Sequence, residues 1–403
     1  MIPEPDSPHS LDVVIAGAGP VGLLLAGELA TQGLRVAVFE RDASPSPVPK
    51  ANGIVGHSAL KLAERGLLDG TGLGVICPPR FQFAPLMLDL GAGPGNPLHI
   101  LPVPQQRLEE LLERRAVAQG ARVYRSREVT GFTQGGASIV IEVRAGDAAA
   151  LVEARYLVGC DGSHSFVRKH AGIGFPGFTS GEIARIARVT IPSAQITRAG
   201  DGLDIAGVGR VAAMRANPMP GGGFSIAPAA VLDPTAPGDL YLISTHEPRG
   251  DAEASDAVSV DELRASLRRV LGADLPFTSA AAIRSIVGNS RQADAYRSGR
   301  VFLAGDAAHV FNAGGAALNV GLQDALDLAR RLTAVLRDGA AAEELDRYES
   351  VRQAAGERAL QHTRAQAALA GTDDGSYALR QVFSTVIAHP TAARALAQLI
   401  EDA

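Results

Sequence analysis

The chain has 403 residues, a length that allows one large domain or two joined ones. Hydrophobic residues make up 46% of it and charged residues 20%, and this balance excludes wholesale disorder. Its net charge of −5 provides no basic field for holding nucleic acid or an anionic membrane. Two cysteines exclude a disulfide framework and a four-cysteine zinc site, and we expect a cytoplasmic protein.

The N-terminal region predicts one βαβ unit. Residues 1–10 are polar and proline-rich, which indicates a disordered lead rather than a signal peptide. LDVVIA (11–16) has the pattern of a buried strand, a helix is expected over 21–33, and RVAVFE (35–40) is a second buried strand. No apolar run in the chain is long enough to cross a bilayer.

The turn between the first strand and the helix carries the motif G-x-G-x-x-G, formed by Gly17, Gly19 and Gly22. These glycines permit a tight turn, close approach of a pyrophosphate, and close packing of helix on strand. The helix N-terminus offers free N–H groups to the phosphates. Glu40 ends the second strand, where its carboxylate can accept hydrogen bonds from ribose hydroxyls. This unit predicts a dinucleotide site but does not distinguish NAD from FAD.

The remaining elements change character along the chain. Further helices are expected at 58–69, 105–119, 260–272 and 317–339 and from 341 onward, and strands at 121–129, 137–145, 155–162 and 299–306. Between 182 and 250, short strands separated by glycine and proline predict an antiparallel sheet. We therefore predict an α/β fold with a three-layer ββα Rossmann-type domain (11–175 and 288–340), an inserted antiparallel-sheet substrate domain (176–287) and a C-terminal helical region (341–403).

Two further motifs favour FAD over NAD. Asp161-Gly162 and Gly305-Asp306 each stand at the end of a predicted strand, and Asp306 is positioned to accept hydrogen bonds from a polyol chain. The pair Gly314-Gly315 then introduces a helix whose positive N-terminal end can face the flavin edge that gains negative charge on reduction. An NAD dehydrogenase needs neither motif.

With these motifs, the chain resembles the single-component FAD-dependent aromatic hydroxylases of the p-hydroxybenzoate hydroxylase fold. Among them it looks most like the polyketide-tailoring monooxygenases that act on anthracycline and angucycline skeletons in antibiotic biosynthesis. We expect it to differ from many such enzymes in having no thioredoxin-like C-terminal domain. The stretches that carry the resemblance are VVIAGAGPVGLLLAGELATQGLRVAVFER, VPQQRLEELL, YLVGCDGSHSFVRKHAGI, and GRVFLAGDAAH followed by LNVGLQDALDLARRL.

The resemblance implies roles for individual residues. Arg41 is expected along the adenosine ribose, Gln105 at the ribityl chain or pyrophosphate, and Val129 at the adenine. Arg168 is expected to steady Asp161, unless it is only a structural ion-pair partner. The expected FAD-binding residues are Gly17, Gly19, Pro20, Val21, Gly22, Glu40, Arg41, Lys50, Gln105, Val129, Asp161, Gly162, Gly305, Asp306, Gly314, Gly315, Leu318 and Asn319.

The sequence departs from the family pattern at two places near the expected flavin. Lys50 stands where the family usually has arginine, which keeps the charge but loses the bidentate fork. The loop 309–317 lacks the usual prolines and glutamine, and this change could alter the oxygen chemistry. Oxidation, Baeyer–Villiger oxygen insertion, rearrangement, or non-catalytic binding therefore stay as alternatives to hydroxylation.

The resemblance also implies the reaction. NAD(P)H would reduce the FAD, O2 would form a flavin C4a-hydroperoxide, and its distal oxygen would pass to an aromatic, polyketide-like substrate. We assign no catalytic acid or base, no metal, and a monomer or homodimer as the assembly; His309 is expected to shape its loop. Four residues of the predicted sheet either line the substrate pocket or form sheet core, namely Met214, Phe224, Ile226 and Tyr241.

Overall fold

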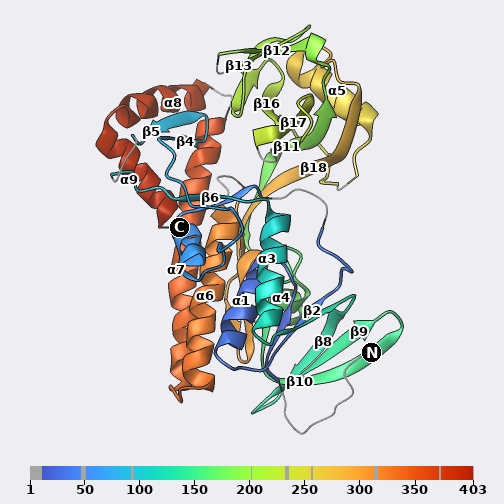
Figure 1. The fold of residues 1–403 in the computed structure, drawn as a ribbon, viewed down its shortest axis with the longest axis vertical. Helices are drawn as coiled ribbons and strands as arrows, with labels where there is room; N and C mark the ends of the chain where they lie inside the picture. Colours follow the sequence, from blue (N-terminus) through green and yellow to red (C-terminus); the bar gives the residue numbers. More distant parts are fainter. Residues whose placement is uncertain are drawn as a thin grey trace.

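The computed structural model describes residues 11–46, 51–91, 95–200, 202–231, 236–255, 257–312, 316–371 and 374–402. The lead predicted at 1–10 lies outside these ranges, as do Lys50, Gly314 and Gly315. Two large sheets and a group of C-terminal helices organise the described residues (Figure 1).

The first sheet has a parallel centre, in which β20, β10, β1, β2 and β7 follow one another as neighbours. β8 and β9 pair antiparallel with the long strand β10, which connects the two parts of the sheet. The strands of this sheet are β1 (Leu11–Ala16), β2 (Val36–Glu40), β7 (Arg122–Arg125), β8 (Glu128–Gln134), β9 (Ile139–Ala145), β10 (Ala148–Gly159), β19 (Arg297–Ser298) and β20 (Val301–Leu303).

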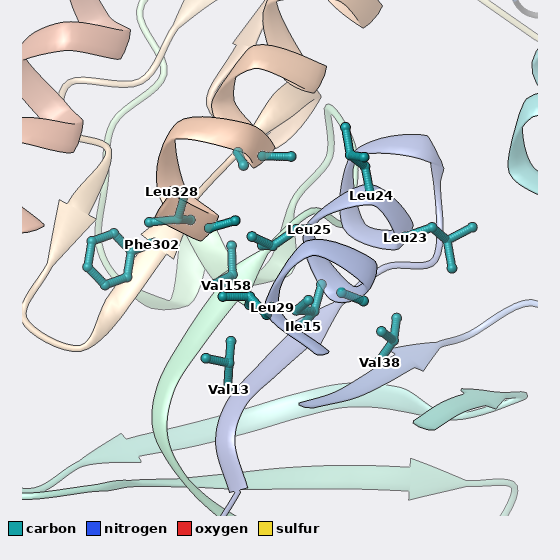
Figure 2. Close-up of a cluster of buried hydrophobic side chains, with 14 of the residues drawn as sticks. Val13, Ile15, Leu23, Leu24, Leu25, Leu29, Val38, Val158, Phe302 and Leu328 are labelled. Atoms are coloured by element: carbon teal, nitrogen blue, oxygen red, sulfur yellow. The ribbon is translucent and has the colours of Figure 1, made fainter. Parts of the chain in front are cut away.

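Helix α1 (Pro20–Thr31) forms the centre of the main core. It packs between α3 (Gln105–Ala118) and α6 (Ala316–Leu336), and apolar residues surround it on almost every side. Figure 2 shows Leu25 and Leu29 on the side of α1 that lies beside Val158 and Ile15 of the central strands, whereas Leu24 lies on the other side of the helix. A helix that is apolar all round is stable only when it is buried on all sides, so the sequence of α1 fixes its central position.

The second sheet is antiparallel and has the order β15-β16-β17-β11-β18-β21. Helix α5 (Val260–Leu271) covers one face of it, and both ends of α5 are capped, by Ser259 at the start and Gly272 (φ 71°) at the end. The strands are β11 (Gly177–Thr190), β15 (Ala216–Met219), β16 (Gly222–Pro228), β17 (Leu240–Pro248), β18 (Ser279–Gln292) and β21 (His309–Val310), with a small sheet of β12 (Ile196–Ala199), β13 (Gly202–Ile205) and β14 (Gly209–Ala212).

The C-terminal helices pack on a small hairpin and form a third hydrophobic cluster, which contains Phe83, Leu88, Leu369, Ile387 and Ile400. No helix of the described ranges combines the length and apolar character needed to cross a membrane. The remaining elements are α2 (His57–Glu64), α4 (Phe166–His170), α7 (Asp346–Ala370), α8 (Asp374–Ile387), α9 (Pro390–Glu401), β3 (Gly53–Val55), β4 (Arg80–Phe83), β5 (Leu86–Asp89), β6 (Ile100–Pro102) and the 3₁₀ turns Ser193–Gln195, Ala229–Val231, Gly305–Ala307 and Ala342–Leu345.

The predicted fold class is confirmed: the protein is a mixed α/β structure with a parallel sheet, an antiparallel sheet and C-terminal helices. The domain boundaries stay a prediction. Strand β18 was missed, because its alanines, glycine and asparagine do not give the β-branched alternation of a typical strand. The helix predicted over 58–69 ends earlier, at Glu64, and is followed by a left-handed glycine at Gly66 (φ 67°).

Buried His362 on α7 makes stability sensitive to acid. Burial lowers the pKa of His362 from 6.5 to about 4. Between these two pH values the imidazole is mostly protonated in the unfolded chain and mostly neutral in the folded chain. Stability is therefore lost as the pH falls from 6.5 towards 4. Between pH 7.5 and pH 5, this histidine should cost wild type about 2 kcal/mol of unfolding free energy. The variant His362→Gln should not show this loss, and urea titration at the two pH values measures it. His389→Gln, at an exposed position, is the control; equal pH dependence in wild type and His362→Gln would contradict this prediction.

Candidate functional site

A cleft of about 430 Å³ opens at the carboxyl ends of the central parallel strands. This is the edge at which open α/β sheets bind ligands. It is lined by the ends of β1 and β2, by the residues that follow β10 and β20, and by the first turns of α1 and α6. Segments that are hundreds of residues apart in sequence therefore meet at one site.

Most of the predicted FAD-binding residues lie on the wall of this cleft. Gly22, Gly305 and Asn319 do not line it, and Lys50, Gly314 and Gly315 lie outside the described residues. The predicted residues on the wall are Gly17, Gly19, Pro20, Val21, Glu40, Arg41, Gln105, Val129, Asp161, Gly162, Asp306 and Leu318.

The glycine turn fits its expected geometry at each position. Gly17 has φ 104°, and a Cβ placed there would lie 2.4 Å from the carbonyl oxygen of Cys160. A Cβ on Gly22 would lie 2.1 Å from the carbonyl oxygen of Gly17, so helix and turn approach too closely for any side chain. A Cβ on Gly19, in contrast, would meet no protein atom within 4 Å. Only Gly19 thus leaves open space beside the helix N-terminus for a ligand.

Backbone groups hold the carboxylate of Glu40 at the mouth of the cleft. Its Oε2 accepts a hydrogen bond from Ala18 N at 2.8 Å, and its Oε1 accepts one from Asp42 N at 2.9 Å. Each carboxylate oxygen has a second lone-pair direction, so Glu40 can still accept hydrogen bonds from a ligand. The two backbone bonds fix the orientation in which it would do so.

Asp161 accepts its hydrogen bonds from its own turn, and Arg168 interacts with it through charge. Its Oδ1 accepts from Ser165 Oγ at 2.5 Å and its Oδ2 from Val167 N at 3.0 Å, so it caps the short helix α4. Arg168 instead donates to the carbonyl oxygens of Ser163 (3.0 Å) and Ala307 (2.9 Å). The guanidinium therefore joins the turn after Asp161 to the turn after Gly305, and no hydrogen bond between Arg168 and Asp161 is present.

The Gly305-Asp306 turn packs directly on the first turn of α1. Gly305 has φ 63°, and a Cβ placed on it would lie 2.9 Å from Val21 Cγ2. Gly321 of α6 is equally tight, because its Cβ would lie 2.8 Å from the same methyl group. Two glycines thus let three segments converge, while the exposed side chain of Asp306 faces the cleft.

Two predicted residues have protein partners that fix their positions. Asn319 is buried, and its Oδ1 accepts a hydrogen bond from Val55 N at 2.8 Å, which ties α6 to β3. Gln105 lines the cleft, and its Nε2 donates to Glu109 Oε1 at 2.8 Å. The first of these contacts orders the backbone beside the cleft, and the second fixes the orientation of the Gln105 side chain at the cleft wall.

Of the two alternatives left open for the four residues of the antiparallel sheet, the structure favours sheet core for three. Phe224, Ile226 and Tyr241 are buried in the hydrophobic core between the antiparallel sheet and α5. Met214 is exposed, in the turn between β14 and β15. Successive side chains of a strand point to opposite faces, and the sequence pattern alone did not reveal which face α5 covers.

Other residues of the cleft wall carried no recognisable sequence signal. They follow the strand ends or flank the predicted residues, and include aromatic, charged and small side chains: Ala16, Phe39, Asp42, Ala51, Glu109, Arg127, Glu128, Cys160, His164, Phe166, Ala304 and Ala317. Burial raises the pKa of the Cys160 thiol, so it stays protonated and acts as a small apolar residue. Within the described ranges no group of three or more His, Cys, Asp or Glu residues could hold a metal ion.

The cleft has the chemistry that a flavin dinucleotide requires. The N-termini of α1 and α6 both border it, so two sets of helix N–H groups are available to negative charge. The carboxylates of Glu40 and Asp306 line it and are hydrogen-bond acceptors for hydroxyl groups. The space beside Gly19 is the place where a pyrophosphate would approach the backbone.

Comparison with known proteins agrees with this chemistry. A family model described as "FAD binding domain" matches residues 10–363. The 12-dehydrotetracycline 5-monooxygenase/anhydrotetracycline 6-monooxygenase of Streptomyces rimosus is 36% identical over an alignment of 401 positions, which covers 96% of this chain and 76% of that protein.

Two solved structures are similarly close. The Diels-Alderase PyrE3 of pyrroindomycin biosynthesis has a TM-score of 0.84 and 32% identity, covering 98% of this chain and 80% of that one. CabE, an aromatic hydroxylase from angucycline biosynthesis, has a TM-score of 0.84 and 30% identity, covering 98% of this chain and 76% of that one.

Proposed function

Because the chain belongs to the FAD binding domain family of flavin monooxygenases, we propose that it hydroxylates a polycyclic aromatic, polyketide-like substrate at the expense of NAD(P)H and O2. The observation that carries the proposal is the convergence of Gly19, Glu40, Asp161 and Asp306 on one cleft at the carboxyl edge of the parallel sheet. The similarity to a tetracycline hydroxylase and to an angucycline hydroxylase supports the substrate class.

The protein's own residues bind and orient the cofactor in this proposal. Glu40 and Arg41 hold the adenosine ribose, Gly19 receives the pyrophosphate, and Asp306 accepts hydrogen bonds from the ribityl hydroxyls. Leu318, in the first turn of α6, brings the positive end of that helix to the isoalloxazine. When bound, FAD supplies the chemistry: it accepts hydride from NAD(P)H and activates O2 for transfer of one oxygen atom.

We infer that the substrate approaches the face of the antiparallel sheet opposite α5. The alternation that buries Tyr241 and Ile243 against α5 turns their neighbours Leu242, Ser244 and His246 to this other face, where they are partly exposed. Burial lowers the pKa of His246, so it is neutral at physiological pH and can exchange hydrogen bonds with phenol or carbonyl groups.

Isotope labelling of the product is the direct test. We expect the purified protein to contain FAD, to consume NAD(P)H faster when a tetracycline-type or angucycline-type phenol is added, and to place one atom of ¹⁸O2 in the product. Mass spectrometry of the product and the flavin absorption spectrum check these outcomes. A flavin-free protein that cannot be reconstituted with FAD would contradict the cofactor assignment, and a product without label would contradict hydroxylation.

A second candidate reaction is a rearrangement or cyclisation that needs bound FAD but no oxygen. The similarity to the Diels-Alderase PyrE3 favours it, as does the loop at 309–317, which departs from the family pattern. Under this candidate the product forms anaerobically and without NAD(P)H. The same reactions run with and without O2 therefore separate the two candidates.

A further inference from the structure

A charged cluster lies buried directly behind the Gly305-Asp306 turn. Asp324 of α6 and His309 of β21 are fully buried, and Arg352 of α7 is 9% exposed. None of the predictions assigned a role to Asp324 or Arg352. Asp324 and His309 are also absent from the cleft wall, so any effect they have on a ligand must pass through other residues.

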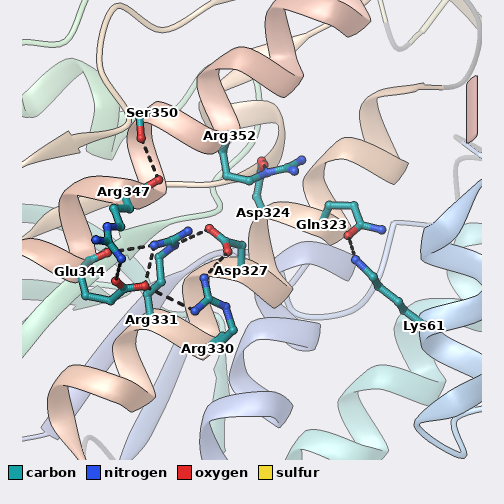
Figure 3. A network of polar contacts seen from close by, with 10 residues as sticks. All are labelled: Lys61, Gln323, Asp324, Asp327, Arg330, Arg331, Glu344, Arg347, Ser350 and Arg352. Atoms are coloured by element: carbon teal, nitrogen blue, oxygen red, sulfur yellow. Dashed lines mark hydrogen bonds and ion pairs between the residues drawn. The ribbon is translucent and has the colours of Figure 1, made fainter. Parts of the chain in front are cut away.

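Both oxygens of Asp324 are used. Its Oδ2 accepts hydrogen bonds from Gly305 N at 3.0 Å and from His309 Nε2 at 2.6 Å. Its Oδ1 accepts from Arg352 Nε at 2.7 Å, and the same guanidinium donates to the carbonyl oxygen of Val320 at 3.0 Å. Figure 3 shows Asp324 and Arg352 facing each other from helices α6 and α7.

The cluster therefore holds the Ala304–Gly305 peptide, whose N–H belongs to the residue before Asp306. The 3₁₀ turn closes through Ala308 N to Gly305 O at 2.8 Å, and Arg168 donates to Ala307 O at 2.9 Å. Asp324 supplies a further contact, on Gly305 N. His309 and Gly305 share the same carboxylate oxygen, so the ring of His309 helps to set the direction from which Asp324 approaches the turn.

The charges of the cluster favour a fixed carboxylate. Burial alone would raise the pKa of Asp324, but His309 and Arg352 outweigh it, so the pKa of Asp324 lies below its usual value. A buried, ionised carboxylate without these partners would be strongly destabilising. Within the described residues, His309 Nδ1 has no hydrogen-bond partner, so the polar role of this ring lies in its Nε2 contact with Asp324.

From this geometry we infer that His309 and Asp324 are positioning residues, which fix the Gly305-Asp306 turn so that the Asp306 carboxylate meets the ribityl chain of FAD. This inference rests on the proposed function. It goes beyond the expected shaping of the loop: His309 orients Asp324, and Asp324 in turn holds the backbone N–H of Gly305. It does not make His309 a proton donor, because the ring does not reach the cleft.

Two amide substitutions at position 309 separate this role from simple packing. The amide nitrogen of glutamine reaches the place of His Nε2, whereas that of asparagine reaches only the place of Nδ1. His309→Gln should therefore keep the hydrogen bond to Asp324, and His309→Asn should lose it. His309→Phe fills the space of the ring and also loses the bond.

The measurements are the FAD dissociation constant, from flavin fluorescence on titration of each protein with FAD, and the melting temperature of each apoprotein. We expect His309→Gln to bind FAD within about threefold of wild type, and His309→Asn and His309→Phe to bind about 10- to 100-fold more weakly. If packing alone mattered, His309→Phe would bind like wild type, and both amides would be impaired equally.

The outcomes are distinguishable from a failure of the proposed function. If wild type itself does not bind FAD, the cofactor assignment fails. If wild type binds FAD and all three variants bind it equally well, the positioning role is wrong. If melting temperatures fall while the FAD affinities of the folded variants are unchanged, the cluster serves stability only, and the inference is likewise overturned.

Discussion

Replacing Asp306 by alanine is expected to weaken FAD binding by about 10- to 100-fold, the loss expected for a hydrogen bond from a hydroxyl to a charged carboxylate. The side chain is exposed at the cleft wall, and the backbone on either side of it is held by Asp324 at Gly305 N and by Arg168 at Ala307 O. Truncation should therefore leave the fold unchanged. Fluorescence titration of the apoprotein with FAD gives the affinity, and circular dichroism reports the fold.

Asp306→Asn and Asp338→Ala are the controls for this experiment. Asparagine keeps an acceptor oxygen without the charge, so its affinity should lie between those of wild type and Asp306→Ala. Asp338 is an exposed aspartate outside the cleft that pairs with Arg337, and its removal should have no effect on FAD. Equal affinity in Asp306→Ala and wild type would show that the ribityl chain lies elsewhere.

Replacing Gly17 by alanine is expected to cost at least about 3 kcal/mol of folding stability and to abolish FAD binding. The new methyl group would lie 2.4 Å from the carbonyl oxygen of Cys160, on a backbone whose φ of 104° is unfavourable for any L side chain. Residues 17 and 160 directly follow the central strands β1 and β10. The backbone of neither residue can move without disturbing the sheet. Urea unfolding of the apoprotein measures the loss.

Gly19→Ala is the matched substitution in the same turn. Its methyl group would meet no protein atom within 4 Å, so the apoprotein should unfold at the same urea concentration as wild type. The methyl group does project where a pyrophosphate would lie, and FAD affinity should fall. A stable Gly17→Ala protein, or a Gly19→Ala protein with unchanged affinity, would contradict the geometry proposed for this turn.

The substitutions at Gly17, Gly19 and Asp306 form two groups, which test different parts of one site. Gly17 acts on the protein itself, because its missing side chain lets β1 and β10 close on each other. Gly19 and Asp306 act on the ligand, because both face the cleft. A site that binds FAD should respond to the second group without loss of stability, whereas a purely structural turn would respond only to the first.

Sequence patterns were reliable wherever a local rule governs the structure. The glycine motif requires particular φ angles and close approach, so Gly17, Gly19 and Gly22 could be assigned before the fold was known. The carboxyl ends of parallel strands meet at one edge, so Glu40 and Asp306 could be expected to lie together. Both lie on the wall of the same cleft.

Sequence patterns left the answer open where it depends on which surface covers a strand. Phe224, Ile226 and Tyr241 were correctly placed on strands, but α5 buries the face that they occupy. A period of two predicts that one face is apolar, and it does not say whether a helix or a ligand covers it.

The sequence by itself determined the α/β fold, the glycine turn and the cofactor class, because those depend on spacing within short segments. Only the tertiary structure decided what holds the site in place. Asp324 reads in the sequence as one acid in an amphipathic helix, yet in the folded chain it is fully buried against Gly305, His309 and Arg352 from three other elements. The physical reason is that a buried carboxylate is tolerated only when distant segments supply its hydrogen bonds, and no local pattern encodes those partners.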